Sequence, residues 1–416
     1  MNRKLISQTL NDWRSNLWLA LELLIVSVVV WYTVDYCYIT YINYNLPMGF
    51  NVTHCYKINF RSVEDSSPDY VRRSSKENMA DKLELIDRLR RRPEIAYASF
   101  SNVAHPYNSS NIGNSFRYDS IWSQGGMLYN RRVTPDFFRV FKLRGARGES
   151  SDELASVMET DGVVISSNMF DDKLNPYDIV RDSIRNNWEA YEVKGVMQPM
   201  RRSEYDQKDV ADHGIIINID LGADDADNVT DELCVRVHDN MDKDFIRNLM
   251  ADASRHYRVG NLFISSVESF DSLREQVVAA DRQRVVWMAA GMAFLLANVF
   301  LGLFGTFWFR TQQRVGEIAI RKVNGATRGD IFRRLIGEGL VILSAVTLPA
   351  IGIDAILVHF EFNQSLVPEA PVFSLANLLV CVFITYALIA LMIIAGIYIP
   401  ARHAMNLDPA VALHDE

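Results

Sequence analysis

One short charged stretch, GEIAIRKVNGATRGDIFRR, carries the residue types best suited to binding a partner. Glu317 and Arg321 are four residues apart, a spacing that puts a carboxylate and a guanidinium side by side on a helix. Gly325 suits the left-handed conformation that ends a helix. Thr327 and Asp330 have the spacing of a capping box that begins the next helix. The stretch therefore predicts two helices joined by a tight turn, a basic helical hairpin.

The two predicted helices also carry apolar positions at helical spacing. Ile331 and Leu335, with Ile336, lead the second helix directly into an apolar span. The first helix carries an apolar face made of four residues: Val315, Ile318, Ala319 and Val323.

Three interpretations of the hairpin compete. Its Lys and Arg side chains could follow membrane topology and bind anionic lipid, but lipid binding explains neither the turn nor the ion pair. A DNA-reading motif is disfavoured because its second helix would continue into a membrane span. The net charge of −8 also disfavours nucleic-acid binding in general. We therefore favour a docking surface for another protein.

No catalytic motif accompanies the hairpin. The sequence contains no G-x-x-x-x-G-K-[ST] phosphate loop, no H-E-x-x-H and no G-x-S-x-G, and its eight His are scattered. Of the four Cys, Cys37 and Cys381 fall in or beside apolar blocks and are expected to pack there. Cys55 and Cys234 could pair in an oxidising compartment, although free thiols are favoured. We expect no enzymatic activity, metal or cofactor on this chain.

Four apolar blocks are long enough to cross a membrane. They run over residues 17–36, 285–309, 335–359 and 375–400. Arg3, Lys4 and Arg14 precede the first block, and the hairpin between the second and third is rich in Lys and Arg. Because Lys and Arg favour the cytoplasmic side, both termini and the hairpin are expected to be cytoplasmic. The segment between the first two spans is then extracytoplasmic.

Glu22 and Asp354 are the charged groups nearest the membrane interior. They are candidate functional groups because ionisable residues are costly inside a membrane, although Glu22 could reach the headgroups and Asp354 lies near the outer end of its span. Ile6 and Leu10 belong to a possible amphipathic helix on the inner leaflet, although a simple extension of the first span fits equally well. Pro349 predicts a kink in the third span.

The composition of the long segment between the first and second spans predicts a folded domain. Met79, Leu83, Ile86 and Leu89 share one helical face, and five short runs are rich in β-branched residues. The irregular alternation predicts a mixed α+β domain, with two lobes as one option. The expected strands are EIAYASF, GVVISS, YEVKGVM, GIIINIDL and LCVRVH. The lead-in to the second span has no Pro or Gly, so one continuous helix is expected there.

These observations divide the chain into six parts: 1–43 (amphipathic helix and first span), 44–266 (extracytoplasmic domain), 267–309 (stalk helix and second span), 310–334 (hairpin), 335–400 (third and fourth spans) and 401–416 (cytoplasmic tail).

The hairpin sequence resembles the signature of the FtsX/MacB family of ABC transporter permeases. The tail IPARHAMNLDPAVAL is similar to the family's ending, and VTPDFFRVFKLRGARGES, GVVISSNMFDDKL and YEVKGVM are similar to MacB-type periplasmic core domains. Ala319 stands where the family often has Gly, and Asn324 where it often has Ala or Leu. The hairpin and tail positions that match are Glu317, Ile320, Arg321, Lys322, Gly325, Ala326, Ile331, Glu338, Pro400, Ala401, Arg402, Asp408, Pro409, Ala410 and Leu413.

The resemblance implies a permease subunit of the inner membrane that works with a separate cytoplasmic ABC ATPase, which binds the ATP. It also implies a second permease copy, identical or paralogous, and a periplasmic adaptor or outer-membrane channel as a possible partner. Members of the family move peptides, toxins or lipoproteins by mechanical coupling, whereas others regulate cell-wall hydrolases, and both alternatives stay open. The residues expected to couple to the ATPase are Glu317, Ile320, Arg321, Lys322, Gly325, Ala326, Thr327, Asp330 and Ile331.

Overall fold

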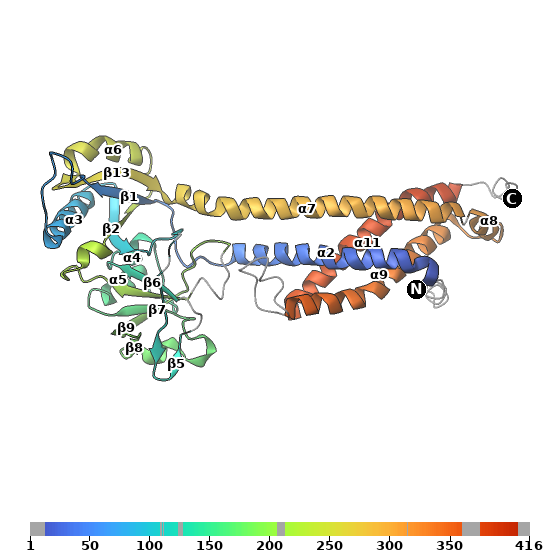
Figure 1. The fold of residues 1–416 in the computed structure, drawn as a ribbon, viewed down its shortest axis with the longest axis horizontal. Helices are drawn as coiled ribbons and strands as arrows, with labels where there is room; N and C mark the ends of the chain where they lie inside the picture. The colour runs from blue at the N-terminus through green and yellow to red at the C-terminus, as the bar shows by residue number, and fades with distance from the viewer. Residues whose placement is uncertain are drawn as a thin grey trace. The chain divides into compact units, whose positions relative to one another are not determined.

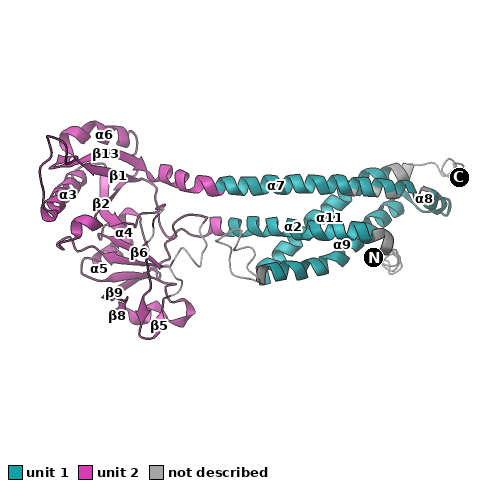
Figure 2. Ribbon diagram, in the orientation of Figure 1, with its two compact units in different colours: residues 1–42, 282–416 teal, residues 43–281 magenta. Residues whose placement is uncertain are grey.

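The computed structural model describes residues 13–108, 110, 112–123, 128–205, 213–313, 315–359 and 375–406. The chain divides into two compact units, one of residues 1–42 and 282–416 and one of residues 43–281 (Figures 1 and 2). We call them the membrane unit and the outer unit. Ile6, Leu10, the segment 360–374 and the tail positions Asp408 to Leu413 lie outside the described residues.

The membrane unit is helical. Among the described residues, four helices are long and apolar enough to cross a membrane: α2 (Trp13–Asn45), α7 (Phe270–Gln313), α9 (Arg328–His359) and α11 (Leu375–Asn406). The short α8 (Val315–Val323) precedes α9. α2 lacks Gly and Pro throughout, and Pro47 follows just after its end. α9 stays helical through Pro349, so the kink stays a prediction. The helices share one apolar core, to which Leu23, Val299 and Leu343 belong.

One helix continues from the outer unit into the membrane unit. α7 extends without interruption for 44 residues, about 66 Å at 1.5 Å per residue. The predicted continuous helix is therefore confirmed, except that Ser266 to Ser269 belong to the preceding strand.

The outer unit is a mixed α/β domain, as the sequence predicts (Figure 1). Within the described residues its strands follow the order β12-β13-β1-β11-β2-β6-β10-β7-β9-β8-β4-β5, and β3 pairs with β6. The β6–β10 and β7–β9 pairs are parallel, whereas the other pairs are antiparallel. The strands are β1 (Cys55–Ser62), β2 (Ile95–Asn102), β3 (Gly113–Asn114), β4 (Arg117–Tyr118), β5 (Ile121–Trp122), β6 (Leu128–Val133), β7 (Val163–Ser166), β8 (Ser183–Arg185), β9 (Ala190–Met197), β10 (Gly214–Asn218), β11 (Glu232–Val237), β12 (Arg258–Val259) and β13 (Leu262–Ser269).

Short helices cover the sheet. They are α3 (Ser75–Arg90), α4 (Phe137–Val140), α5 (Ser151–Val157), α6 (Phe245–His256) and the 3₁₀ turns η1 (Asp171–Lys173), η2 (Pro176–Ile179) and η3 (Ala226–Val229). α3 begins with a capping box between Ser74 and Glu77 and buries Met79, Ile86 and Leu89, whereas Leu83 is only partly buried. Three apolar clusters lie along the sheet, including Phe100, Phe137 and Phe170 respectively.

Candidate functional site

The turn between α8 and α9 adopts the predicted geometry. Gly325 has φ of 89°, and a Cβ at this position would meet nothing within 4 Å. Its N–H donates to the Lys322 carbonyl over 3.0 Å, and the Ala326 N–H donates to the Arg321 carbonyl, also over 3.0 Å. This pair of bonds is a Schellman motif, which satisfies carbonyls at the end of α8. Glycine is favoured here by backbone conformation rather than by lack of space.

The start of α9 confirms the predicted capping box. The Thr327 hydroxyl accepts the Asp330 N–H over 3.2 Å, and the Asp330 carboxylate accepts the Thr327 N–H over 3.0 Å. The turn is thus closed on both sides by local hydrogen bonds. Its conformation is therefore specified by a few adjacent residues.

Glu317 connects the two helices of the hairpin. Its Oε1 accepts from Arg321 Nε over 3.0 Å and from Nη2 over 2.7 Å, which confirms the predicted i,i+4 pair. The same oxygen lies 3.8 Å from Nη2 of Arg334 on α9, and Arg334 Nε lies 3.5 Å from Glu338. The resulting chain of charges crosses from α8 to α9. Sequence reasoning found the first pair but not the link to Arg334.

The apolar face of α8 is buried only in part. Ile318 and Ala319 are buried, with exposed fractions of 6% and 3%. Val323 is 67% exposed, because the chain leaves the helix there for the Schellman turn. Ile320 is also exposed, at 53%. The side chain of Val315 lies outside the described residues.

The exposed side of the hairpin combines apolar and basic groups. Ile320 and Val323 supply aliphatic surface, and Ile331 is buried beneath the hairpin in the core of the membrane unit. Arg328 and Arg333 are exposed and have no carboxylate within 4 Å in the described part of the chain. Such a mixed surface suits a protein partner with an apolar pocket and acidic rim.

Glu22 of α2 lies against α7. A Cβ on Gly302 would lie 2.6 Å from the Glu22 Oε1, so the glycine leaves the room that this side chain occupies. Asp354, the other predicted candidate, is 2% exposed and lines a small cavity. Asp35, which sequence reasoning did not single out, is also buried, and its carboxylate accepts from the Cys381 thiol over 3.6 Å.

Residues 201–204 of the outer unit contact both the last turn of α2 and the first turns of α7. The buried Arg201 donates from Nη1 to the Asn43 carbonyl, near the end of α2, over 2.7 Å. Three residues further on, Glu204 accepts from Arg274 Nε of α7 over 2.5 Å and from the Tyr107 hydroxyl over 3.0 Å. Burial, and then the charge of Glu204, raise the pKa of Tyr107, which therefore stays a donor. We call Arg201, Glu204 and Arg274 the helix clamp.

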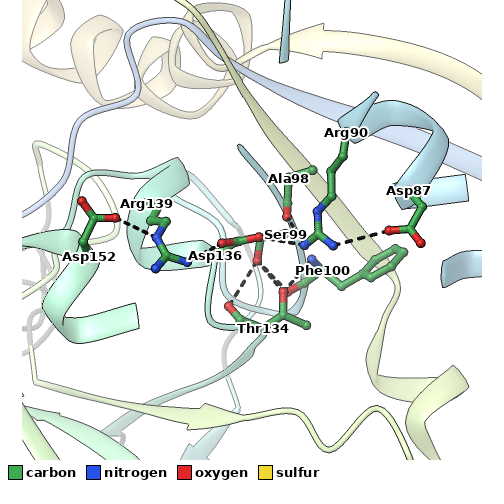
Figure 3. Close-up of polar contacts among 9 residues, drawn as sticks. All are labelled: Asp87, Arg90, Ala98, Ser99, Phe100, Thr134, Asp136, Arg139 and Asp152. Carbon is green, nitrogen blue, oxygen red and sulfur yellow. Dashed lines mark hydrogen bonds and ion pairs between the residues drawn. The ribbon is translucent and has the colours of Figure 1, made fainter. Parts of the chain in front are cut away.

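A chain of alternating charges joins three helices of the outer unit (Figure 3). Arg90 lies 2.7 Å from Asp136, and Arg139 lies 2.8 Å from both Asp136 and Asp152. Beside these pairs, Thr134 accepts the Phe100 N–H over 3.1 Å. The neighbouring cleft has a volume of about 240 Å³. Since both arginines on its rim are already paired, this arrangement is best suited to holding α3, α4 and α5 together.

A second, more open cleft of about 570 Å³ lies between the ends of α3 and α6. Arg92 on its wall forms ion pairs with Glu94 and Asp252, at 3.1 and 2.8 Å.

Elsewhere in the outer unit, burial lowers the pKa of His105 despite the nearby Glu232 carboxylate. Within the described residues, no group of three or more His, Cys, Asp or Glu is placed to hold a metal ion.

Comparison with known proteins points to the same region of the chain. Residues 289–409 match the family described as FtsX-like permease C-terminal. The macrolide export ATP-binding/permease protein MacB of Vibrio parahaemolyticus is 27% identical over 143 residues, which is 34% of this chain and 21% of that protein. MacB 1/2 of Paracoccus denitrificans is 25% identical over 182 residues, 44% of this chain and 26% of that protein. The matched segments thus span roughly a quarter of these relatives.

A solved structure is also similar. The periplasmic region of MacB from Actinobacillus actinomycetemcomitans aligns with a TM-score of 0.32 and 11% identity, over 55% of this chain and 94% of that one. The hairpin lies inside the matched family region, which confirms the resemblance drawn from its residues. Residues 289–409 therefore match the FtsX-like permease family, and parts of the chain are similar to MacB proteins.

Proposed function

We propose that this chain is the membrane subunit of an ABC transporter, and that the α8–α9 hairpin docks a separate cytoplasmic ATPase, which binds the ATP. The exposure of Ile320 and Val323 beside unpaired arginines carries this proposal, because both aliphatic side chains would be better buried. Glu317 and Gly325 fix the shape of the surface, whereas Ile331 attaches it to the bundle.

The same subunit is proposed to transmit movement to its outer unit. α7 is one unbroken helix, and its first turns are tied by Arg274 to Glu204. Arg201 ties the end of α2 in the same segment. A displacement of α7 driven by the ATPase would then reach the outer unit without a flexible joint. Transport of peptides, toxins or lipoproteins is the proposed use of that movement.

A second permease copy is proposed to pack against α7. Gly291, Asn298 and Gly305 are spaced by seven residues, so they lie along one face of the helix. In the described part of the chain, a Cβ built on either glycine would meet nothing within 4 Å beyond the neighbouring residues and backbone of its own helix, and Asn298 is exposed. Small residues allow close helix contact in a membrane, and a polar amide favours a partner there. Replacing both glycines by Ile should lower the dimer fraction, whereas Gly352→Ile on α9, also in open space, should not.

The proposed location is the bacterial inner membrane, with both termini and the hairpin cytoplasmic and the outer unit periplasmic. An adaptor or outer-membrane channel is a further proposed partner. The alternative function, regulation of cell-wall hydrolases, uses the same movement and differs in what the outer unit binds. Identification of proteins retained by the full chain from its native membrane separates the two, because a hydrolase rather than an efflux partner would favour regulation.

The docking proposal is tested by purification of the full chain with its ATPase. Ile320→Asp should reduce ATPase retention at least tenfold, because a charge replaces an apolar contact at the centre of the surface. Ile246→Asp, on an exposed site of α6, is the matched control and should retain the ATPase. Equal retention by both variants would contradict docking at the hairpin.

A further inference from the structure

Three helices of the membrane unit line a small cavity of about 10 Å³, whose mainly apolar wall carries a few polar side chains. α2 contributes Ser27 and Trp31, one turn apart, and Asp35 follows one turn later. α9 contributes Asp354, and α11 contributes Thr385. On α2 these residues are four positions apart, and α9 and α11 each contribute one of them. The sequence therefore shows no continuous polar run. The polar side chains come together only when the three helices pack.

Four polar atoms lie at this cavity without a hydrogen bond between them. Within the described residues, Asp354 Oδ1, Trp31 Nε1, Ser27 Oγ and Thr385 Oγ1 are buried and have no hydrogen-bond partner. Their residues are between 1% and 5% exposed. No Lys, Arg or His nitrogen lies within 4 Å of the Asp354 carboxyl in the described part of the chain. Unsatisfied polar groups of this kind are rare in native proteins and usually mark a ligand or water site.

The space and the chemistry define what the cavity can hold. A volume of about 10 Å³ is close to the minimum that accommodates one water molecule. An ionised carboxylate without a cation partner is costly in an apolar interior, whereas a neutral carboxylic acid costs far less. We propose that Ser27, Trp31, Asp354 and Thr385 form an intramembrane proton-binding site, in which one water molecule bridges the donors to a protonated Asp354.

The other titratable groups around the site leave Asp354 as the proton acceptor. On α2, the Asp35 carboxylate accepts a hydrogen bond from the Cys381 thiol of α11. Tyr386 of α11 lines the cavity, but its hydroxyl is paired with Ser344 over 3.0 Å. Among the described residues, α7 contributes none to the cavity lining.

Proton binding here is tied to the packing of the bundle. The proton comes from bulk water, and its bond to a carboxyl oxygen replaces a buried negative charge by a neutral acid. Separation of α2 from α9 and α11 would admit more water, which stabilises the ionised form and releases the proton. The site therefore links protonation to whether these three helices are closed.

Infrared difference spectroscopy of the full chain in lipid nanodiscs tests the proposal. The spectrum of wild type minus Asp354→Asn at neutral pH should contain one C=O stretching band of a protonated carboxyl, which disappears on alkaline titration. Glu22→Gln is the matched control, because it removes another carboxyl of the membrane unit and should leave the band intact. Absence of the band at every pH, or a band abolished by Na⁺ at constant pH, would overturn proton binding.

Two further variants keep the test decisive if Asp354→Asn does not fold. Trp31→Phe and Thr385→Val retain the carboxyl but each removes one donor of the cavity. Both should shift the frequency of the band, since hydrogen bonding to the carboxyl changes, while retaining its loss at alkaline pH. An unshifted band in both variants would show that these donors do not share a site with Asp354.

Discussion

Glu317 on α8 and Arg334 on α9 form an ion pair across the hairpin turn, with 3.8 Å between Oε1 and Nη2. Both side chains are partly exposed, so the pair contributes little to stability, about 0–1 kcal/mol. Its main effect is geometric, because it links the polar sides of two helices that are also joined by the turn.

Reversal of this charge should uncouple the hairpin. In Glu317→Lys, the new ammonium repels Arg321 and Arg334, so the two helices lose their polar link. We expect stimulation of the partner ATPase to fall at least fivefold, while membrane insertion is unchanged. ATP hydrolysis by the reconstituted complex measures the effect. Glu64→Lys, an exposed charge reversal in the outer unit, is the control. Wild-type stimulation in Glu317→Lys would refute the role of this pair.

Gly325 should be sensitive to any β-carbon, although space is available. At φ of 89°, Gly325→Val costs about 1–2 kcal/mol through backbone strain. The turn is expected to open, with a loss of ATPase stimulation and faster amide hydrogen exchange at Ala326. Gly329→Ala, in the first turn of α9, introduces no strain and should leave both properties near wild type. Identical exchange in the two variants would contradict the role of the turn.

The helix clamp should depend on the charge of Glu204. Glu204→Gln weakens its hydrogen bonds to Arg274 and Tyr107, and bonds to charged groups contribute about 1.5–3 kcal/mol. Amide exchange over residues 270–275 is expected to accelerate at least tenfold, because the first turn of α7 is released. Hydrogen–deuterium exchange of the full chain provides the measurement, with Glu64→Gln as control. Unchanged protection of this segment would exclude Glu204 as an anchor of α7.

Acid should loosen the start of α3. The Ser74 N–H, followed by the Ser74 hydroxyl, holds the pKa of the Glu77 carboxyl below its usual range. The folded state therefore binds this proton less readily than the unfolded state, and its stabilisation is present above the ordinary carboxyl pKa. That stabilisation is lost as the pH falls through the lowered value. Amide exchange of residues 77–79 should accelerate with acid in wild type, relative to the intrinsic rate, and change less in Glu77→Gln. The same acid response in both would contradict the assignment.

Cys55 and Cys234 should remain free thiols even under mild oxidation. Cys55 lies opposite Arg236, and Cys234 opposite Lys57, so the two Cys are diagonal neighbours, a separation of about 7–8 Å that exceeds usual disulfide geometry. Burial raises the pKa of Cys55 to about 12, so almost no thiolate exists at neutral pH. Site-resolved mass spectrometry should detect alkylation of both only after unfolding. A Cys55–Cys234 linked peptide would refute this prediction.

Local chemistry made the hairpin predictable from sequence. Gly325, Thr327 and Asp330 act on neighbouring backbone groups, so their types and spacing define the turn. The same holds for the five strands rich in β-branched residues, each of which the structure confirms. The exposure of Val323 was not predictable by periodicity, because the helix ends at that residue.

Long-range relationships could not be obtained in this way. Trp31 precedes Asp354 by more than 300 residues, and Thr385 lies on the next span after Asp354. Nothing in the local sequence of these three residues shows that they meet. Arg201 and Glu204 lie in an irregular segment with no periodic pattern. Such contacts depend on the assembled fold, which one sequence does not specify by pattern alone.

The position of β1 has a consequence for synthesis. β1 is one of the first parts of the outer unit to be translated, yet its neighbours on both sides, β11 and β13, are among the last. A ribosome must therefore add more than 160 residues after Ser62 before either neighbour exists. Nascent β1 has an unsatisfied edge throughout that interval, so a chaperone that shields extended segments should increase the yield of correctly folded chain.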